Sequence, residues 1–296
     1  MNPGELIHLY IDGAFDRREL VRRLAKLVGG TQAAIGLIAA EGLMAQECQT
    51  CPDDVRVPPD AADLTMQSIQ YDGQASPLFG YLATRITDST DPIPGVVVIH
   101  ENRGLTDYVK DVTRRLARAG YMALGIDLLS RLGGTDQYAN DPTAAVSAYN
   151  SLSADARLQD MLSSLAYLKS LPMTSGKKIG CIGFCAGGGN SFQLAVNGGK
   201  DVSAAVVFYG TPPTQAQVAD QLSAPVLCLF GEQDRNFTGQ LPGFITNALN
   251  ARKSFEAHVY QGANHAFHND TGAAYNRDAA CDAWAKTLAW YGKYLA

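Results

Sequence analysis

Short apolar runs alternate with helical stretches in this chain from Thr65 to its end. Residues 95–100, GVVVIH, are rich in β-branched side chains and are typical of a strand buried on both faces of a parallel sheet. We expect strands at residues 66–71, 78–85, 95–100, 121–127, 178–184, 204–209, 225–230 and 255–260, the first two as a hairpin, and helices at 105–119, 142–170, 191–196 and 275–295. This alternation predicts an α/β fold, a doubly wound and mostly parallel sheet with helices on both faces.

The first 60 residues have a different pattern. Residues 4–45 predict one or two helices. Residues 51–60 contain three prolines and three aspartates and indicate a linker, because proline lacks a backbone donor and disfavours helix in the residue before it. A chain of 296 residues is long enough for one large α/β domain and such an extension. We therefore assign residues 1–60 to an N-terminal helical extension and linker, and residues 61–296 to the α/β domain.

Charge and hydropathy argue against two classes of partner. Charged residues make up 18% of the chain and the net charge is −5, so a basic surface for nucleic acid is not expected. No stretch reaches the roughly 18 uninterrupted apolar residues that a membrane-spanning helix requires. We expect a monomer or small homo-oligomer that acts on a small molecule without a metal or another cofactor.

The cysteines and the N-terminus bear on the cellular compartment. Six cysteines are too few for a disulfide framework in a chain of this length, and a reactive thiol persists best in a reducing compartment, so we expect the cytoplasm. Export is the alternative, because Arg17 and Arg18 precede residues 27–45, a mostly apolar stretch interrupted by glycines and polar residues. Cys48 and Cys51 form a lone C-x-x-C without further zinc ligands or a βαβ setting, and we interpret them as incidental thiols.

A glycine-rich turn around Cys185 follows the strand predicted at residues 178–184 and opens a helix. Its sequence, GFCAGG, has the G-x-nucleophile-x-G pattern of a nucleophile elbow, with cysteine in the nucleophile position. A nucleophile held at positive φ needs neighbours without bulk, which Gly183 and Gly187 supply. The start of the helix is expected to lower the thiol pKa and to stabilise an oxyanion. The alternative is a small buried cysteine in a glycine-rich phosphate-binding turn.

An acid and a histidine follow in the order expected for an α/β-hydrolase. Asp234 comes in the turn after the strand at residues 225–230, and His265 comes in the turn after the last predicted strand. The order nucleophile, acid, histidine is typical of this fold and differs from that of other triad folds. Histidine would accept the thiol proton while the aspartate fixes its tautomer. Glu232 is the alternative acid and His268 the alternative base.

These residues resemble the dienelactone hydrolase family, single-domain α/β-hydrolases with a cysteine in a G-x-C-x-G-G elbow. The resemblance runs from about Met66 to the C-terminus and leaves residues 1–60 without a counterpart in the short members of the family. It implies that Glu101, at the end of an early strand, takes part in activating the thiol. It also implies an oxyanion hole made of the backbone amides of Asn102 and Ala186. The alternative is that Glu101 is a loop carboxylate that only pairs with Arg103.

The resemblance also suggests how substrate is bound. Residues 127–131, DLLSR, are similar to an acid-to-arginine stretch in which the arginine binds a substrate carboxylate, so Arg131 is a candidate substrate-binding residue, with a solvated surface arginine as the alternative. Arg103 and Phe267 complete the predicted substrate contacts. The family usually has a second arginine four residues after the catalytic histidine, where this chain has Asn269. That departure weakens the case for the carboxylate-bearing diene-lactone itself.

The sequence therefore predicts a hydrolase that cleaves a small carboxylic ester or lactone through Cys185 and an acyl-enzyme intermediate. Two alternatives remain. In the first, the chain is a non-catalytic or redox-responsive binding protein in which Cys185 is an oxidisable thiol. In the second, the enzyme hydrolyses a thioester or a peptide.

Overall fold

The computed structural model describes residues 17–30 and 56–296 of the chain. The chain divides into two units, residues 1–52 and 53–296. In the first unit, the described segment is helix α2 (Arg17–Val28) with the two residues after it, so a helix occurs where the sequence predicts one or two. The rest of the predicted extension, including Cys48 and Cys51, lies outside the described residues.

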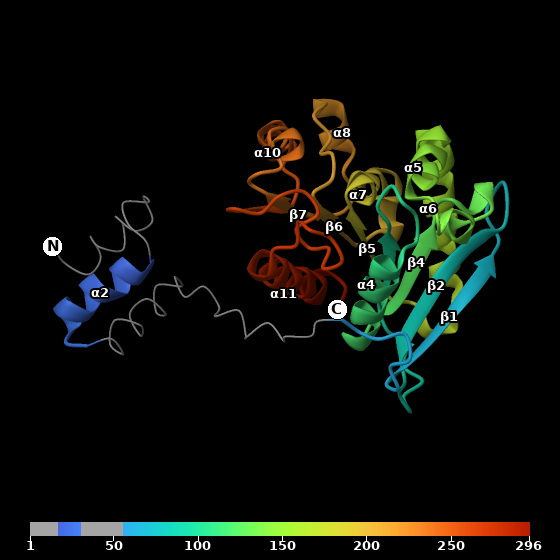
Figure 1. The fold of residues 1–296 in the computed structure, drawn as a ribbon, viewed down its shortest axis with the longest axis horizontal. Helices are drawn as coiled ribbons and strands as arrows, with labels where there is room; N and C mark the ends of the chain where they lie inside the picture. The colour runs from blue at the N-terminus through green and yellow to red at the C-terminus, as the bar shows by residue number, and fades with distance from the viewer. Residues whose placement is uncertain (1–16, 31–55) are drawn as a thin grey trace. The chain divides into compact units, whose positions relative to one another are not determined.

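One eight-stranded sheet forms the frame of the second unit (Figure 1). The strands are β1 (Leu64–Tyr71), β2 (Leu78–Arg85), β3 (Gly95–Ile99), β4 (Met122–Asp127), β5 (Ile179–Phe184), β6 (Ala204–Phe208), β7 (Val226–Gly231) and β8 (Phe255–Tyr260). Their spatial order is β1-β2-β4-β3-β5-β6-β7-β8. β2 pairs antiparallel with β1 and with β4, and all other neighbours are parallel. Because β4 lies on one side of β3 and β5 to β8 follow on the other, the sheet is doubly wound, and both this prediction and the hairpin are confirmed.

Helices follow most of the strands of the sheet. They are α4 (Asp107–Arg118), α5 (Pro142–Ser151), α6 (Ala154–Ser170), α7 (Ala186–Asn197), α8 (Ala216–Gln221), α9 (Arg235–Thr238), α10 (Leu241–Asn250) and α11 (Arg277–Tyr294), with short 3-10 turns η1 (Ser130–Leu132), η2 (Thr135–Tyr138), η3 (Pro172–Thr174) and η4 (Gly199–Asp201). The helix predicted over residues 142–170 is two helices, because Leu152 is extended and the Ser153 side chain caps the N-terminus of α6. α8 to α10 were not predicted from the sequence.

Two hydrophobic cores lie on the two faces of the sheet. Successive side chains of a strand point to opposite faces, and in β3 Val96 and Val98 join one core while Val97 and Ile99 join the other. The first core includes α4 and α11, and the second includes α6, α7 and α10. β3 is buried along its whole length, as its β-branched sequence predicts.

The carboxyl ends of the parallel strands bring the predicted site residues to one edge of the sheet. Glu101 follows β3, Cys185 follows β5, Asp234 follows β7 and His265 follows β8. Parallel strands all point the same way, so these loops open on the same side. The fold thereby assembles a site from segments that are far apart in the sequence.

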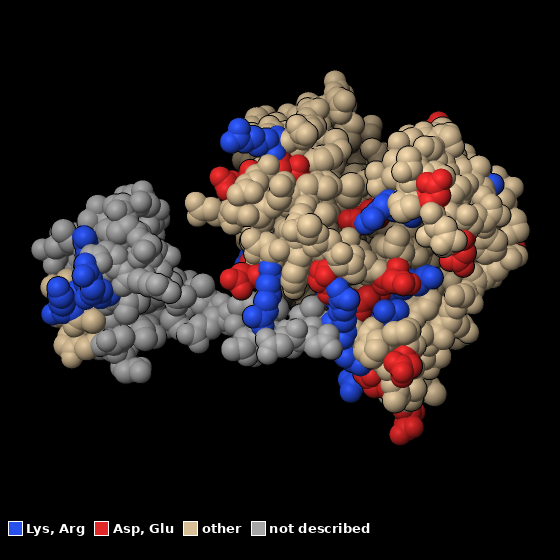
Figure 2. Space-filling model, viewed as in Figure 1, with Lys and Arg blue, Asp and Glu red and all other residues tan. Residues whose placement is uncertain are grey.

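The helices, the surface charge and the cysteines bear on the partners and the cellular compartment of the protein. Within the described ranges, every helix is too short or too polar to cross a membrane. On the face drawn in Figure 2, acidic and basic side chains lie interspersed over the second unit. Cys181, Cys185 and Cys228 are free thiols, whereas Cys281 is disulfide-bonded. Since disulfides persist mainly in oxidising compartments, the cytoplasmic location stays a prediction.

Candidate active site

Cys185 occupies a sharp turn between β5 and α7. Its φ is 56° and its ψ is −117°, a left-handed conformation that is strained for a residue with a side chain. A Cβ on Gly183 would lie 1.9 Å from the carbonyl oxygen of Gly187, and a Cβ on Gly187 would lie 2.3 Å from the carbonyl oxygen of Ile99. The predicted need for glycine on both sides of Cys185 is therefore confirmed, and the turn places the thiol at the N-terminus of α7.

The thiol of Cys185 is protonated at neutral pH. Burial and, to a smaller extent, the Glu101 carboxylate raise its pKa to about 11, although the backbone amide of Ala186 acts in the opposite direction. The net pKa of the thiol is therefore raised. The amide acts with the expected sign, but the loss of hydration and the nearby negative charge outweigh it.

Asp234 and His265 are in direct contact. The Nδ1 atom of His265 lies 2.6 Å from Oδ2 of Asp234, and the Asp234 side chain is 6% exposed against 31% for the histidine ring. The two loops are joined by backbone hydrogen bonds, since Glu232 N–H donates to Tyr260 and Gln233 N–H donates to Ala263. A buried carboxylate on Nδ1 fixes the tautomer that leaves Nε2 as a proton acceptor.

The alternative acid and the alternative base have other partners. The Glu232 carboxylate accepts a hydrogen bond from the backbone of Gly262 at 3.0 Å, which ties the loop after β7 to the loop after β8. His268 is buried, its Nδ1 lies 2.8 Å from the hydroxyl of Tyr108, and burial lowers its pKa well below the usual value. These contacts leave Asp234 and His265 as the pair that the structure brings together.

Glu101 is a buried carboxylate with two polar neighbours. Nδ2 of Asn269 donates to its Oε2 at 3.2 Å, and Nη2 of Arg103 lies 3.6 Å from the same oxygen. Burial raises the pKa of Glu101, while Arg103 and His265 lower it. The Glu101 charge acts on Cys185, and His265 acts on Glu101, so the three residues belong to one electrostatic unit. The alternative interpretation, in which Glu101 is a loop carboxylate paired only with Arg103, accounts for only part of this environment.

Of the two backbone amides predicted to form the oxyanion hole, that of Ala186 acts on Cys185 in the structure. The backbone amide of Ala186 begins α7 and acts as a donor toward Cys185. Asn102 lies in the turn that follows β3, next to Glu101, and is partly buried. Its assignment as the second donor stays a prediction from the family resemblance.

Two of the three predicted substrate contacts are engaged within the fold. Nε and Nη2 of Arg131 each lie 2.8 Å from an oxygen of the buried Asp160, so this arginine fastens η1 to α6 and the role of a carboxylate-binding residue is not supported. The prediction for Phe267 is wrong, because its side chain is 0% exposed and packs against Tyr209 and Tyr260. The loop turns inward beside it at Ala266, whose φ is 62°.

The remaining predicted contact, Arg103, is open to solvent. Its side chain is 46% exposed, and it lines a cavity of about 230 Å³ between α4 and η2. Arg103 therefore lines this cavity while it also pairs with Glu101, and its role in substrate binding stays a prediction.

Three aromatic residues at the site were not predicted. Phe237 stacks on the ring of His265 with centroids 5.0 Å apart, and Tyr209 meets the same ring edge-on at 5.1 Å. Tyr149 lies close enough for the charge of Cys185 to act on its pKa. Tyr209 follows β6 and could have been found by the strand-end rule, whereas no sequence signal distinguishes Phe237 or Tyr149.

The arrangement has the parts of a thiol-dependent acyl transfer site. A strained cysteine lies at a helix start, Nδ1 of a histidine contacts a buried aspartate, and a second buried carboxylate acts on the thiol. Among the described residues, no cluster of three or more histidine, cysteine, aspartate or glutamate side chains could hold a metal ion.

Known proteins share both the sequence and the fold of the second unit. The family model of the dienelactone hydrolase family matches residues 79–295. A carboxymethylenebutenolidase-like protein of Saccharolobus solfataricus is 31% identical over 254 residues, which cover 74% of this chain and 95% of the relative. One from Escherichia coli K12 is 30% identical over 253 residues, covering 81% and 90%.

Solved structures agree with the sequence comparison. A dienelactone hydrolase-like protein from Klebsiella pneumoniae has a TM-score of 0.71 at 26% identity, covering 78% of this chain and 99% of that one. A dienelactone hydrolase-like promiscuous phosphotriesterase from metagenomic libraries has a TM-score of 0.69 at 25% identity, covering 79% and 100%. The fold is therefore the α/β-hydrolase fold, and this chain belongs to the dienelactone hydrolase family.

Proposed function

We propose that this enzyme hydrolyses a small carboxylic ester or lactone with Cys185 as its nucleophile, Asp234 and His265 as the acid and base of a triad, and Glu101 as a carboxylate that acts on the thiol. The observation that carries the proposal is the 2.6 Å contact between His265 and Asp234, on the same sheet edge as the strained cysteine. The family membership and the names of the relatives, which are carboxymethylenebutenolidase-like, support the substrate class.

Acylation begins with the thiol protonated. When the ester carbonyl lies against Cys185, Nε2 of His265 takes the thiol proton while the sulfur forms a bond to the carbonyl carbon. The carbonyl oxygen becomes an oxyanion, which the amides of Ala186 and Asn102 stabilise. The carbon–oxygen bond of the ester then breaks, and the leaving alkoxide takes the proton from His265. In a lactone, that alcohol stays attached to the acyl chain.

Deacylation repeats the sequence with water. His265 takes a proton from a water molecule, whose oxygen attacks the thioester carbon. The carbon–sulfur bond breaks, the sulfur recovers the proton from His265, and the carboxylic acid leaves. Asp234 keeps its hydrogen bond to Nδ1 in both steps and stabilises the ring when it is charged.

The raised thiol pKa favours hydrolysis over the redox alternative. Oxidation of cysteine requires the thiolate, and a thiol with a pKa of about 11 is almost fully protonated near neutral pH. In the hydrolytic mechanism His265 takes the thiol proton as the sulfur attacks the bound carbonyl, so the free enzyme does not need a standing thiolate.

Replacement of the nucleophile tests the proposal. Turnover of p-nitrophenyl acetate and of a simple lactone is expected to vanish in Cys185→Ala, and a stable acyl-enzyme mass is expected on Cys185 in His265→Ala when an activated ester is used. Cys228→Ala, which removes a buried free thiol of β7, is the matched control and should retain turnover. Full activity in Cys185→Ala would refute the assignment. Hydrolysis of thioesters or peptides in preference to esters would instead support the alternative in which the enzyme cleaves a thioester or a peptide.

A further inference from the structure

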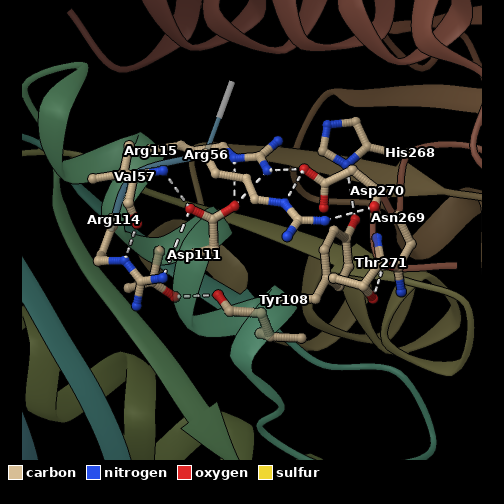
Figure 3. A network of polar contacts seen from close by, with 12 residues as sticks. Arg56, Val57, Tyr108, Asp111, Arg114, Arg115, His268, Asn269, Asp270 and Thr271 are labelled. Atoms are coloured by element: carbon tan, nitrogen blue, oxygen red, sulfur yellow. Dashed lines mark hydrogen bonds and ion pairs between the residues drawn. The ribbon is translucent and has the colours of Figure 1, made fainter. Parts of the chain in front are cut away.

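The loop between β8 and α11 is fastened at three successive residues just after His265. His268 contacts the Tyr108 hydroxyl at 2.8 Å, Asn269 donates to Glu101 at 3.2 Å, and Asp270 accepts from Arg115 at 2.7 Å. Figure 3 shows His268, Asn269 and Asp270 facing α4, from which Tyr108 and Arg115 project. The loop that carries the catalytic base is thus also joined to a carboxylate of the site.

Asp270 is the anchor of this loop. It forms a buried ion pair with Arg115, whose side chain is 7% exposed and which is held from the other side by Asp111. Arg56 adds a 3.1 Å contact to the same carboxylate. Buried charges of this kind are stable only when each has its partners in place, so the network fixes the loop at this residue.

The side-chain amide of Asn269 has a fixed orientation. Its Oδ1 accepts hydrogen bonds from the backbone of Thr271 at 3.0 Å and from the Thr271 hydroxyl at 2.6 Å. Both donors require the oxygen of the amide on that side, so the NH₂ group must point toward Glu101. Asn269 is 3% exposed, and water has little access to compete for the contact.

We propose that Asn269, oriented by Thr271 and by the Asp270–Arg115 ion pair, is a positioning residue that holds the Glu101 carboxylate as an anion beside Cys185. This inference rests on the proposed function of the site and adds a residue through which the loop after β8 controls the pH range of activity. Asn269 touches neither substrate nor the thiol in this assignment and acts through Glu101 alone.

The sign of the effect follows from the groups around Glu101. The titratable groups that face it are Arg103 on its own loop, Cys185 at the start of α7, Tyr108 on α4, Tyr209 after β6 and His265 after β8. Burial raises the pKa of Glu101, and the hydrogen bond from Asn269 lowers it because it stabilises the ionised form. Without the hydrogen bond from Asn269, burial should raise the pKa of Glu101 further, and the carboxyl group should stay protonated to higher pH.

The direct test is the titration of Glu101 by carbon NMR in the full chain labelled at the glutamate carboxyl carbons. The chain has seven glutamates, and the Glu101 signal is assigned by its loss in Glu101→Gln. Asn269→Leu should raise the pKa of Glu101 by about one unit, as expected for the loss of one hydrogen bond to a charged group. Thr271→Val, which removes only the orienting hydroxyl, should raise it by a smaller amount without any change of charge.

Enzyme kinetics provide the second readout. The acid limb of kcat/KM for a neutral ester should move to higher pH in both variants, in parallel with the Glu101 titration. Thr246→Val is the matched control, because Thr246 is exposed and its hydroxyl donates to the backbone carbonyl of Pro242 within α10. It should leave both the titration and the pH profile unchanged.

Each outcome separates the inference from the function on which it rests. An unchanged Glu101 pKa in folded Asn269→Leu and Thr271→Val would overturn the inference, even if both variants lose activity. A Glu101 shift without a shift of the acid limb would show that Glu101 is not required as an anion and would also overturn it. Activity that persists in Cys185→Ala would refute the proposed function, while the NMR titration would still report whether Asn269 governs Glu101.

Discussion

The thiol of Cys185 receives opposing influences from two of its neighbours. The amide of Ala186 favours the thiolate, whereas the Glu101 carboxylate opposes it, and burial adds to the opposition. The effect of the Ala186 amide can be predicted from the sequence, because the start of a helix after Cys185 is recognisable from the motif. The effect of the Glu101 carboxylate depends on a loop about 80 residues earlier in the chain, so the net sign follows only from the folded arrangement.

Replacement of Glu101 by glutamine should make Cys185 more acidic. Glutamine keeps the shape of the side chain and removes the charge that raises the thiol pKa, so this pKa should fall from about 11. Alkylation of Cys185 by iodoacetamide at pH 8 is then expected to become roughly tenfold faster, as for a decrease of about one pKa unit. Mass spectrometry of the Cys185 peptide measures the rate.

The matched control for this change is Glu256→Gln. Glu256 lies on β8 with a half-exposed side chain and pairs with His258 and Lys293. Its replacement should leave the alkylation rate of Cys185 unchanged. Equal or slower alkylation in Glu101→Gln would contradict the electrostatic role of this carboxylate.

At the scale of elements, the turn from β5 into α7 depends on close contact with its neighbours. The first turn of α7 passes so near the end of β3 that only hydrogen atoms fit between Gly187 and two carbonyl groups, those of Ile99 and His100. His100 contributes to the same region, since its Nε2 accepts a hydrogen bond from Leu128 at 2.9 Å and its ring is buried. The elbow is therefore fixed by packing as well as by its own backbone.

Gly187→Ala should destabilise the protein and Gly189→Ala should not. A Cβ at position 187 would meet backbone oxygens at 2.3 and 2.5 Å, so the strand or the helix must move, at a cost of about 1–3 kcal/mol in the free energy of unfolding. At position 189 the nearest atom to a Cβ would be the backbone nitrogen of Thr211, 3.7 Å away, and alanine in a helix is favoured over glycine by about 0.5–1 kcal/mol. Urea unfolding of both variants measures the difference, and equal stabilities would contradict the packing argument.

The elements differ in how well they could be predicted. Strands β3 to β8 and the order of Cys185, Asp234 and His265 follow from apolar runs and from the rule that loops at the carboxyl ends of parallel strands meet. α10 was not predicted. Pro242 and Gly243 lie in its first turn, where proline is tolerated although both residues disfavour a helix interior. Phe267 was misassigned because a neighbour of the base in sequence can point into the core, which depends on the left-handed backbone at Ala266.

At the scale of the whole molecule, the folded second unit begins before the segment that the family model matches. The family model starts at residue 79, yet residues 56 and 57 are bonded to α4 and to the loop after β8. Val57 N–H donates to Asp111 at 2.7 Å, its carbonyl accepts from Arg114 at 2.5 Å, and Arg56 contacts Asp270. These contacts satisfy buried charged groups on α4, so we expect the segment to be part of the stable unit.

Two truncations that differ by five residues test this boundary. A chain of residues 53–296 is the reference, because it retains every contact of Arg56 and Val57 with α4 and Asp270. Cys281 is replaced by serine in both chains, because Cys281 is disulfide-bonded and both chains lack residues 1–52, which contain the two remaining cysteines. A chain of residues 58–296 leaves Asp111 and Arg114 without their backbone partners, and its melting temperature should fall by roughly 5–10 °C relative to the longer chain. Differential scanning calorimetry measures both. Equal melting temperatures would mean that α4 satisfies its charges without residues 56 and 57, and the stable unit would then begin closer to β1.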